Sequence, residues 1–223
     1  MNYELEKEGI LMYQNDPLKV LTGEVRLSYC NLSVPKAPAN NPNAEPKYSV
    51  TLLIPKSDFA TKADIDNAIE AAAKAAQSSV WGGVRPPIIK SVVHDGDGVR
   101  QSGVAFGPEC KGHWVITAST KMKPQVVGID NINCELDPRD VYSGMYARVT
   151  LRFYGYLNSG NKGVGCGLGN VMKTRDGEPL AGGASAASDF AGIGQAAVQP
   201  QGYTAAPAMP QGQAINPITG LPM

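Results

Sequence analysis

Histidine and cysteine are scarce in this sequence of 223 residues, which contains two of the first and four of the second. No serine lies in a G-x-S-x-G motif, and neither His94 nor His113 forms a recognisable dyad motif with a cysteine. A nucleophilic active site is therefore not indicated, although one assembled from distant residues stays open as an alternative. We expect a protein that is not an enzyme and that needs no cofactor and no metal.

The few cysteines are Cys30, Cys110, Cys134 and Cys166, and they lie far apart with no C-x-x-C pair among them. A zinc ribbon or a small disulfide framework would need closely spaced cysteines, so this spacing argues against both. We expect free thiols that are buried or half-buried.

Long apolar runs are absent as well, since no stretch approaches the roughly 18 apolar residues of a membrane span. The first eight residues are acidic and lack the basic start of a secretion signal, so we expect the protein in the cytoplasm. Lysine and arginine together number 20, as do aspartate and glutamate, and the net charge is zero. Any attraction of a charged partner must therefore come from a local arrangement of side chains.

The chain does have 43% hydrophobic residues and enough length to bury one substantial core. After Leu180 the composition changes to mostly Ala, Gly, Pro and Gln, and Asp189 is the only charged residue that follows. Ordering that segment would cost roughly 1 to 2 kcal/mol per residue of backbone entropy, which its few apolar residues do not offset. We predict one folded domain at 1–180 and a flexible, disordered tail at 181–223.

Alternation of apolar and polar residues predicts strands along the first 180 residues. In the first strand Val25, Leu27 and Tyr29 share one side, and a long exposed loop at 31–46 follows. The predicted strands cover 20–34, 47–54, 111–123, 125–129, 144–156 and 163–173.

One helix interrupts this series of strands. Ser57 or Asp58 can cap it, and apolar residues recur at three- and four-residue intervals through an alanine-rich run that ends near Ala76. Six strands, with one helix between the second and the third, predict a mainly β protein with an OB-fold-like β-barrel.

The strand at 145–156 carries the clearest functional pattern. Its first face is apolar and belongs to a core, whereas the second alternates aromatic rings with guanidinium groups. Rings can stack on exposed bases, at about 1 to 3 kcal/mol each, while guanidinium groups hold the phosphates between them. Cross-strand pairing on a solvated face explains the same residues without any ligand. The apolar face comprises Met145, Ala147, Val149, Leu151 and Phe153, and the second comprises Tyr146, Arg148, Thr150, Arg152, Tyr154 and Tyr156.

Lysines near other strand ends favour binding modestly, although lysines at a strand end also protect a sheet edge against aggregation. Trp114 shares a face with Ile116 and is expected in the core, whereas Trp81 either caps the core or presents its ring to a base. The predicted nucleic-acid-binding residues are Tyr146, Arg148, Arg152, Tyr154, Tyr156, Lys111, Lys121, Lys123 and Lys162.

Two further motifs look chemical at first sight. The run from Gly163 to Gly169 has a glycine at every second residue, unlike G-x-G-x-x-G, and no G-K-[ST] follows, so a nucleotide-hydrolysing loop is not indicated. Such a glycine face lets a backbone or a nucleic-acid strand approach closely, or belongs to a tightly curved barrel strand. Asp95 and Asp97 begin like a calcium loop that no acidic residue closes, so we expect a turn.

The block Y-S-G-M-Y-A-R-V-T-L-R-F-Y-G-Y at 142–156, with 158–173 and 175–180, resembles a bacteriophage family long labelled as of unknown function. That family consists of OB-fold single-stranded DNA-binding proteins, and the similarity runs from Gly23 to Leu180. The resemblance implies binding of single-stranded DNA during phage replication or recombination, in the host cytoplasm. Many replication proteins of this kind end in an acidic tail that recruits partners, and the lone Asp189 departs from that pattern.

Two hypotheses from different classes follow. The first is a non-enzymatic protein that coats and protects single-stranded DNA largely independently of sequence. It acts alone or as a homo-oligomer, and its tail contacts phage or host replication proteins. The alternative is a virion or assembly protein with a β domain and a spacer tail. Only the alternative predicts large assemblies in the absence of DNA.

Overall fold

The computed structural model describes residues 16–38, 41–100, 102–158 and 160–180, and the predicted tail at 181–223 lies outside them. The elements in chain order are β1 (Lys19–Leu21), β2 (Val25–Lys36), β3 (Lys47–Pro55), α2 (Phe59–Ser78), β4 (Val93–Asp95), the 3-10 turn η1 (Pro108–Cys110), β5 (His113–Thr120), β6 (Val126–Gly128), β7 (Asn131–Glu135), the 3-10 turn η2 (Pro138–Asp140), β8 (Tyr146–Asn158) and β9 (Asn161–Arg175).

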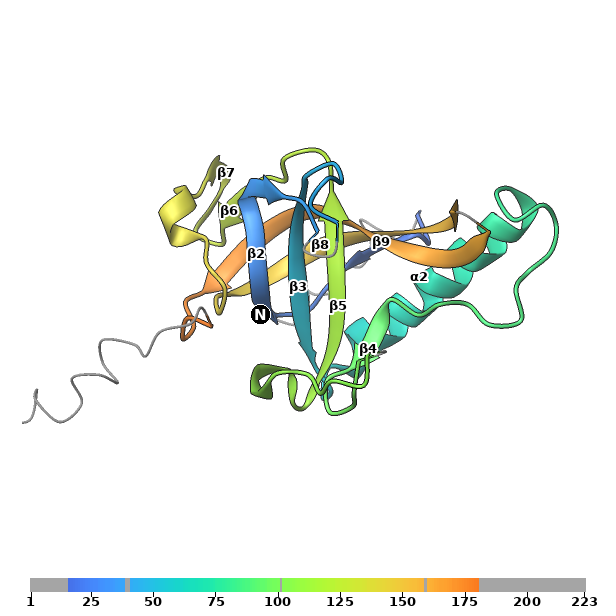
Figure 1. Cartoon of the computed structure of the whole chain (residues 1–223). Coiled ribbons are helices and arrows are strands. Elements are labelled where there is room, and N and C mark those ends of the chain that lie inside the picture. The colour runs from blue at the N-terminus through green and yellow to red at the C-terminus, as the bar shows by residue number, and fades with distance from the viewer. Residues whose placement is uncertain (1–15, 39–40, 101, 159, 181–223) are drawn as a thin grey trace, which may run out of the picture. The chain divides into compact units, whose positions relative to one another are not determined.

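Five of these strands close into a barrel. The neighbours around the ring are β8, β2, β3, β5 and β9, and β9 pairs again with β8. All the pairings in the ring are antiparallel except that of β5 with β9. In Figure 1, β2, β3 and β5 stand side by side while β8 and β9 cross behind them. This five-stranded ring is an OB-fold and confirms the mainly β barrel expected from the sequence.

The core fills the inside of this ring, where alternate residues of each strand point inward. Every residue of the apolar face that was predicted for the strand at 145–156 is at most 1% exposed. On β3, Val50, Leu52 and Ile54 are completely buried, as their alternation predicts. Trp114 on β5 is half-buried and packs against this core, in agreement with its expected role.

The helix α2 packs against β8, β1 and β9. It begins as predicted, because the Asp58 side chain accepts a hydrogen bond from the backbone N–H of Thr61 at 3.0 Å. Gly155 allows α2 to approach β8 closely, since a Cβ there would lie 2.1 Å from the Cβ of Ala76. Trp81, which follows the helix, is 2% exposed and therefore belongs to the core. None of the helices in the described ranges is long and apolar enough to cross a membrane.

The first predicted strand differs from the structure in two ways. Thr22 to Glu24 separate β1 from β2, and β2 continues to Lys36, so the predicted loop at 31–46 is shorter than expected. Tyr29 does not share the buried side of the strand and is 64% exposed. The reason is a β-bulge, because the register with β3 shifts after Ser28 and Tyr29 has a φ of +49°.

Two short strands, β4 and β7, were not predicted from the alternation of residues. β7 has the sequence N-I-N-C-E, in which Ile132 and Cys134 alternate with polar residues, but the strand has only five residues and all five are exposed. Cys134 lies on β7 and is exposed, which corrects the expectation that all four thiols are buried or half-buried. The other three cysteines are buried or half-buried free thiols, as expected.

Candidate nucleic-acid interface

Small polar side chains line the outward face of β3 and β5, the second and third strands of the barrel in chain order. Thr51 and Thr117 lie opposite each other, with their hydroxyl oxygens 3.0 Å apart. Ser49 and Ser119 form the next pair, and Asn31 of β2 donates its side-chain amide to the Ser49 hydroxyl at 3.2 Å. Hydroxyl and amide groups on a sheet surface offer hydrogen bonds to a ligand without blocking its approach.

Beside β5, two tyrosines of β8 lie across the glycines of β9. Tyr154 is the direct partner of Gly165, and Tyr156 is the direct partner of Gly163. A Cβ added at Gly165 would lie 2.7 Å from Cζ of Tyr154, and one at Gly163 would lie 2.6 Å from Oη of Tyr156. The glycine at every second residue therefore makes room for two rings from the neighbouring strand.

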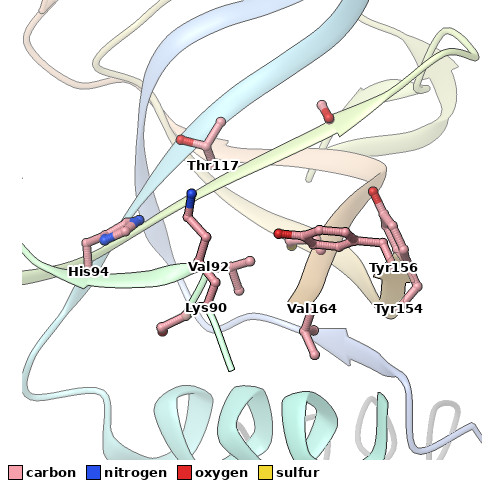
Figure 2. A pocket seen from close by; sticks show the side chains of 11 residues that line it. Lys90, Val92, His94, Thr117, Tyr154, Tyr156 and Val164 are labelled. Carbon is pink, nitrogen blue, oxygen red and sulfur yellow. The ribbon is translucent and has the colours of Figure 1, made fainter. Parts of the chain in front are cut away.

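A pocket of about 310 Å³ opens beside these rings. Figure 2 shows Tyr154 and Tyr156 on one side of the pocket, Lys90 and His94 on the other, and Thr117 in its wall. The segment that carries Lys90 reaches the pocket because it forms an isolated parallel bridge with the start of β9. The pocket thus combines two phenol rings, an ammonium group, an imidazole and a hydroxyl.

Burial raises the pKa of two side chains that line this pocket. Burial, and secondarily the charges of Cys166 and Tyr156, raises the pKa of Tyr154 above its usual value, so its phenol is neutral and can donate a hydrogen bond at neutral pH. Burial also raises the pKa of the Cys166 thiol to about 12. Cys166 is therefore protonated at neutral pH and is not an activated nucleophile.

The predicted turn at Asp95 and Asp97 is held by a lysine. The ammonium of Lys56 lies 2.6 Å from a carboxylate oxygen of each aspartate. Hydrogen bonds from Lys56 lower the pKa of both carboxyls, so both remain charged partners of the lysine. Within the described ranges there is no group of three or more His, Cys, Asp or Glu side chains that could hold a metal ion.

Comparison with known proteins decides the family. The family model described as the ssDNA-binding protein of Enterobacter phage Enc34 matches residues 18–200. This chain belongs to the Enc34 ssDNA-binding family. The matched range begins just before β1 and extends 20 residues beyond Leu180.

Solved structures of the bacteriophage Enc34 protein are similar to this Enc34-family chain. The structure of that single-stranded DNA-binding protein in complex with ssDNA has a TM-score of 0.62 at 29% identity, covering 74% of this chain and 91% of that one. Another structure of the Enc34 protein has a TM-score of 0.60 at 30% identity, covering 79% and 91%. Protein p50 of Acyrthosiphon pisum secondary endosymbiont phage 1 is 32% identical over an alignment of 177 residues, and the match covers 74% of this chain and 88% of p50.

The residues of β8 that the sequence nominates for binding fall into two groups in this Enc34-family chain. Tyr154 and Tyr156 line the pocket. At the other end of β8, the Tyr146 ring lies under the guanidinium carbon of Arg175, which is 3.4 Å from the ring centroid. Arg152 forms an ion pair with Asp16 at 3.0 Å.

Glu24 is the centre of a charge cluster beside the Tyr146 end of β8. Arg175 donates to its carboxylate at 2.8 Å, and Thr174 donates at 2.7 Å. The hydrogen bond from Arg175 is the main cause of a lowered pKa at Glu24, and the positive charge of Arg148 contributes to it. Tyr146, Arg148 and Arg152 therefore have charged groups of the same chain as neighbours.

The four predicted lysines lie outside the lining of the pocket. Lys121 forms an ion pair with Glu45, and Lys123 forms one with Glu135 at 3.1 Å. Lys162 donates to the carbonyl oxygens of Trp81 at 2.8 Å and Val84 at 3.2 Å, so it holds the segment that follows α2. The fourth, Lys111, is exposed just before β5.

Sequence reasoning missed several residues of this interface. Asn31, Thr117 and Ser119 lie on the polar sides of their strands, where such residues are common and carry no distinctive signal. His94 lies in β4 and Lys90 lies just before it, and no alternation of apolar and polar residues marks this strand. Four of them, Lys90, His94, Thr117 and Ser119, line one pocket with the tyrosines of β8, because β4 pairs with β5 and Lys90 forms a bridge to β9. Asn31 belongs to the same polar face through its hydrogen bond to Ser49.

Proposed function

We propose that this protein binds single-stranded DNA without catalysing a reaction, through the outward face of β3 and β5 and the tyrosines beside it. One observation carries the proposal, namely the solved complex of the Enc34 protein with ssDNA, to which this chain is similar at a TM-score of 0.62. The location on this chain is supported by the fold, because OB-folds bind oligonucleotides on the face of their second and third strands.

The chemistry of the interface suits binding that is independent of sequence. Every base has a π-face, so the rings of Tyr154 and Tyr156 offer stacking surfaces that any base can use. The hydroxyls of Thr51 and Thr117 can donate to phosphate oxygens, and they can donate to or accept from bases. Lys90 supplies a positive charge beside the rings, where a phosphate between two stacked bases would lie.

In the cell, such a protein would coat DNA strands exposed during phage replication or recombination, in the host cytoplasm, and protect them from nucleases and re-annealing. The division into a binding domain at 1–180 and a tail at 181–223 that contacts replication proteins belongs to the same proposal. The family match favours this role over a virion protein with a spacer tail.

The deciding experiment is fluorescence anisotropy of labelled oligo-dT and of a matching duplex, at low salt and near 0.2 M salt. We expect tight binding of the single strand that weakens as salt rises, because binding releases counterions from the phosphates. We expect clearly weaker binding of the duplex. No binding of oligo-dT at low salt, together with large assemblies of the free protein by light scattering, would favour the virion alternative.

A further inference from the structure

Gly165 and Gly163 leave no room for a side chain between β9 and the two tyrosine rings. A Cβ at position 165 would lie 2.7 Å from Cζ of Tyr154 and 2.9 Å from its Oη. A Cβ at position 163 would lie 2.6 Å from Oη and 2.7 Å from Cζ of Tyr156. Real Cβ atoms essentially never come within 3.0 Å of another heavy atom, so any other residue at either position displaces a ring.

Gly167 is different, although it belongs to the same run of alternate glycines. A Cβ at position 167 would lie 3.7 Å from Cε1 of Tyr154, which is an ordinary van der Waals contact, and 3.3 Å from the carbonyl oxygen of Arg152. An alanine at 167 therefore needs a small adjustment and leaves the Tyr154 ring where it is. The chain thus contains its own matched control for the effect of a methyl group on β9.

The direction in which a displaced ring can move is restricted. Val164 and Cys166, on either side of Gly165, are buried in the core at 1% and 5% exposure, so the barrel is filled on that side. Tyr154 is 46% exposed and lines the pocket. A methyl group at position 165 would therefore push the ring outward, into the space of the pocket.

The pocket matches the size and chemistry of one nucleotide. Its volume of about 310 Å³ is at the lower end of the range of roughly 300–1,000 Å³ typical of small-molecule sites. The rings of Tyr154 and Tyr156 form one wall, while Lys90 and His94 form the other (Figure 2). An aromatic wall suits a base, and an ammonium group opposite it suits the phosphate attached to that base.

We propose that this pocket receives one unstacked base of the bound strand, which stacks on Tyr154, and that Gly163 and Gly165 are positioning residues that keep the pocket open. The glycines act through the tyrosines, because they determine how close to β9 the rings can lie. This inference rests on the proposed function and adds to it a defined place for one nucleotide.

The first test is a double-mutant cycle with oligo-dT, measured by anisotropy. We expect Tyr154→Ala and Gly165→Ala each to weaken binding about tenfold, within the range for loss of one stacked base, and Gly167→Ala to leave it nearly unchanged. In the Tyr154→Ala background, Gly165→Ala should have no further effect, because the ring that it displaces is absent. Wild-type affinity in Gly165→Ala, or an equal loss in both backgrounds, would overturn the inference.

A second measurement does not depend on the folding of the glycine variants. The fluorescent base 2-aminopurine is placed at each position of a short oligonucleotide in turn, since stacking on a tyrosine quenches it. We expect at least one position to be quenched by the wild-type protein and not by Tyr154→Ala. If the protein binds but no quenching depends on Tyr154, the proposed base-binding role of the pocket is wrong and the proposed function stands. If the wild-type protein does not bind at all, both proposals are wrong.

Discussion

The two halves of the outward face of β8 both carry tyrosine rings, and these rings have different surroundings. In the first half, from Tyr146 to Arg152, which we call the paired end, Tyr146 lies against Arg175, and Arg152 at the middle of the strand forms an ion pair with Asp16. At the other end, Tyr154 and Tyr156 lie over glycines beside an open pocket. Tyr146 and Arg152 therefore contact charged groups of the same chain, whereas Tyr154 and Tyr156 line the pocket. The difference between the rings comes from the neighbouring strands, since Tyr146, Tyr154 and Tyr156 are the same residue type.

Removal of both rings from the open end should have the largest effect. We expect the double variant Tyr154→Ala and Tyr156→Ala to lose roughly 100-fold in affinity for oligo-dT, because two stacked bases at about 1 to 3 kcal/mol each are lost. The matched control is the double change to phenylalanine, which keeps both rings and should bind nearly as well. Anisotropy measures both, and unchanged affinity in the alanine variant would place binding elsewhere on the surface.

The salt dependence of binding should separate Lys90, which lines the pocket, from Arg152, which forms an ion pair with Asp16. We expect Lys90→Ala to reduce the slope of log K against log salt by about 0.7, the value for one phosphate contact on a single strand. Arg152→Ala should change the slope less, because Asp16 already neutralises this guanidinium at 3.0 Å. Titrations at four or more salt concentrations give the slopes. A larger change of the slope in Arg152→Ala than in Lys90→Ala would contradict this expectation and indicate that Arg152 contacts a phosphate.

Loss of the ring at the paired end should affect stability more than binding. We expect Tyr146→Ala to lower the free energy of unfolding by about 1 kcal/mol, since a cation–π contact with Arg175 is lost at an exposed site. Urea unfolding measures this value, and Tyr146→Phe should retain most of the stability. A large loss of DNA affinity in Tyr146→Ala, with stability unchanged, would contradict the assignment of this ring to the fold.

The smallest effect should come from Glu24, and it should depend on pH. The pKa of this carboxyl lies below the ordinary value of 4.5, mainly because Arg175 donates to it. A carboxyl with a lowered folded-state pKa stabilises the fold above its ordinary pKa, and this contribution is lost as the pH falls through the folded-state pKa. We expect Glu24→Gln to be less stable than the wild type by under about 1 kcal/mol at pH 7.

Thermal unfolding between pH 7 and pH 3 tests the sign of this effect. The difference in melting temperature between wild type and Glu24→Gln should shrink as the pH falls below 4.5. A difference that stays constant over this range would show that the Glu24 charge does not stabilise the paired end.

Features of the fold that depend on neighbours in sequence were predictable. Asp58 caps α2 as expected, because a cap needs only its own side chain and a backbone N–H three residues ahead. The buried face of β8 was predicted for the same reason, since alternation is a local property of a strand. Tyr29 was placed on the wrong side, because a bulge depends on pairing with β3, which the pattern of β2 does not reveal.

The candidate site was predictable only in part. Tyr154 and Tyr156 were nominated from their strand, and they line the pocket. Lys162 was also nominated, and it lies outside the lining of the pocket and donates to the carbonyls of Trp81 and Val84. A lysine that faces a ligand and a lysine that holds a neighbouring segment of the same chain look alike in the sequence. Only the position of its ammonium, set by the segment that follows α2, distinguishes them.

The sequence by itself determined the mainly β class, the helix and its cap, the two faces of β8, the spacing of the glycines and the family resemblance, because each follows from local periodicity or a contiguous motif. Tertiary structure alone decided which half of the outward face of β8 is open, and it brought Lys90, Thr117 and Tyr154 to one pocket. The physical reason is the closure of the barrel, in which strand register joins residues far apart in the chain.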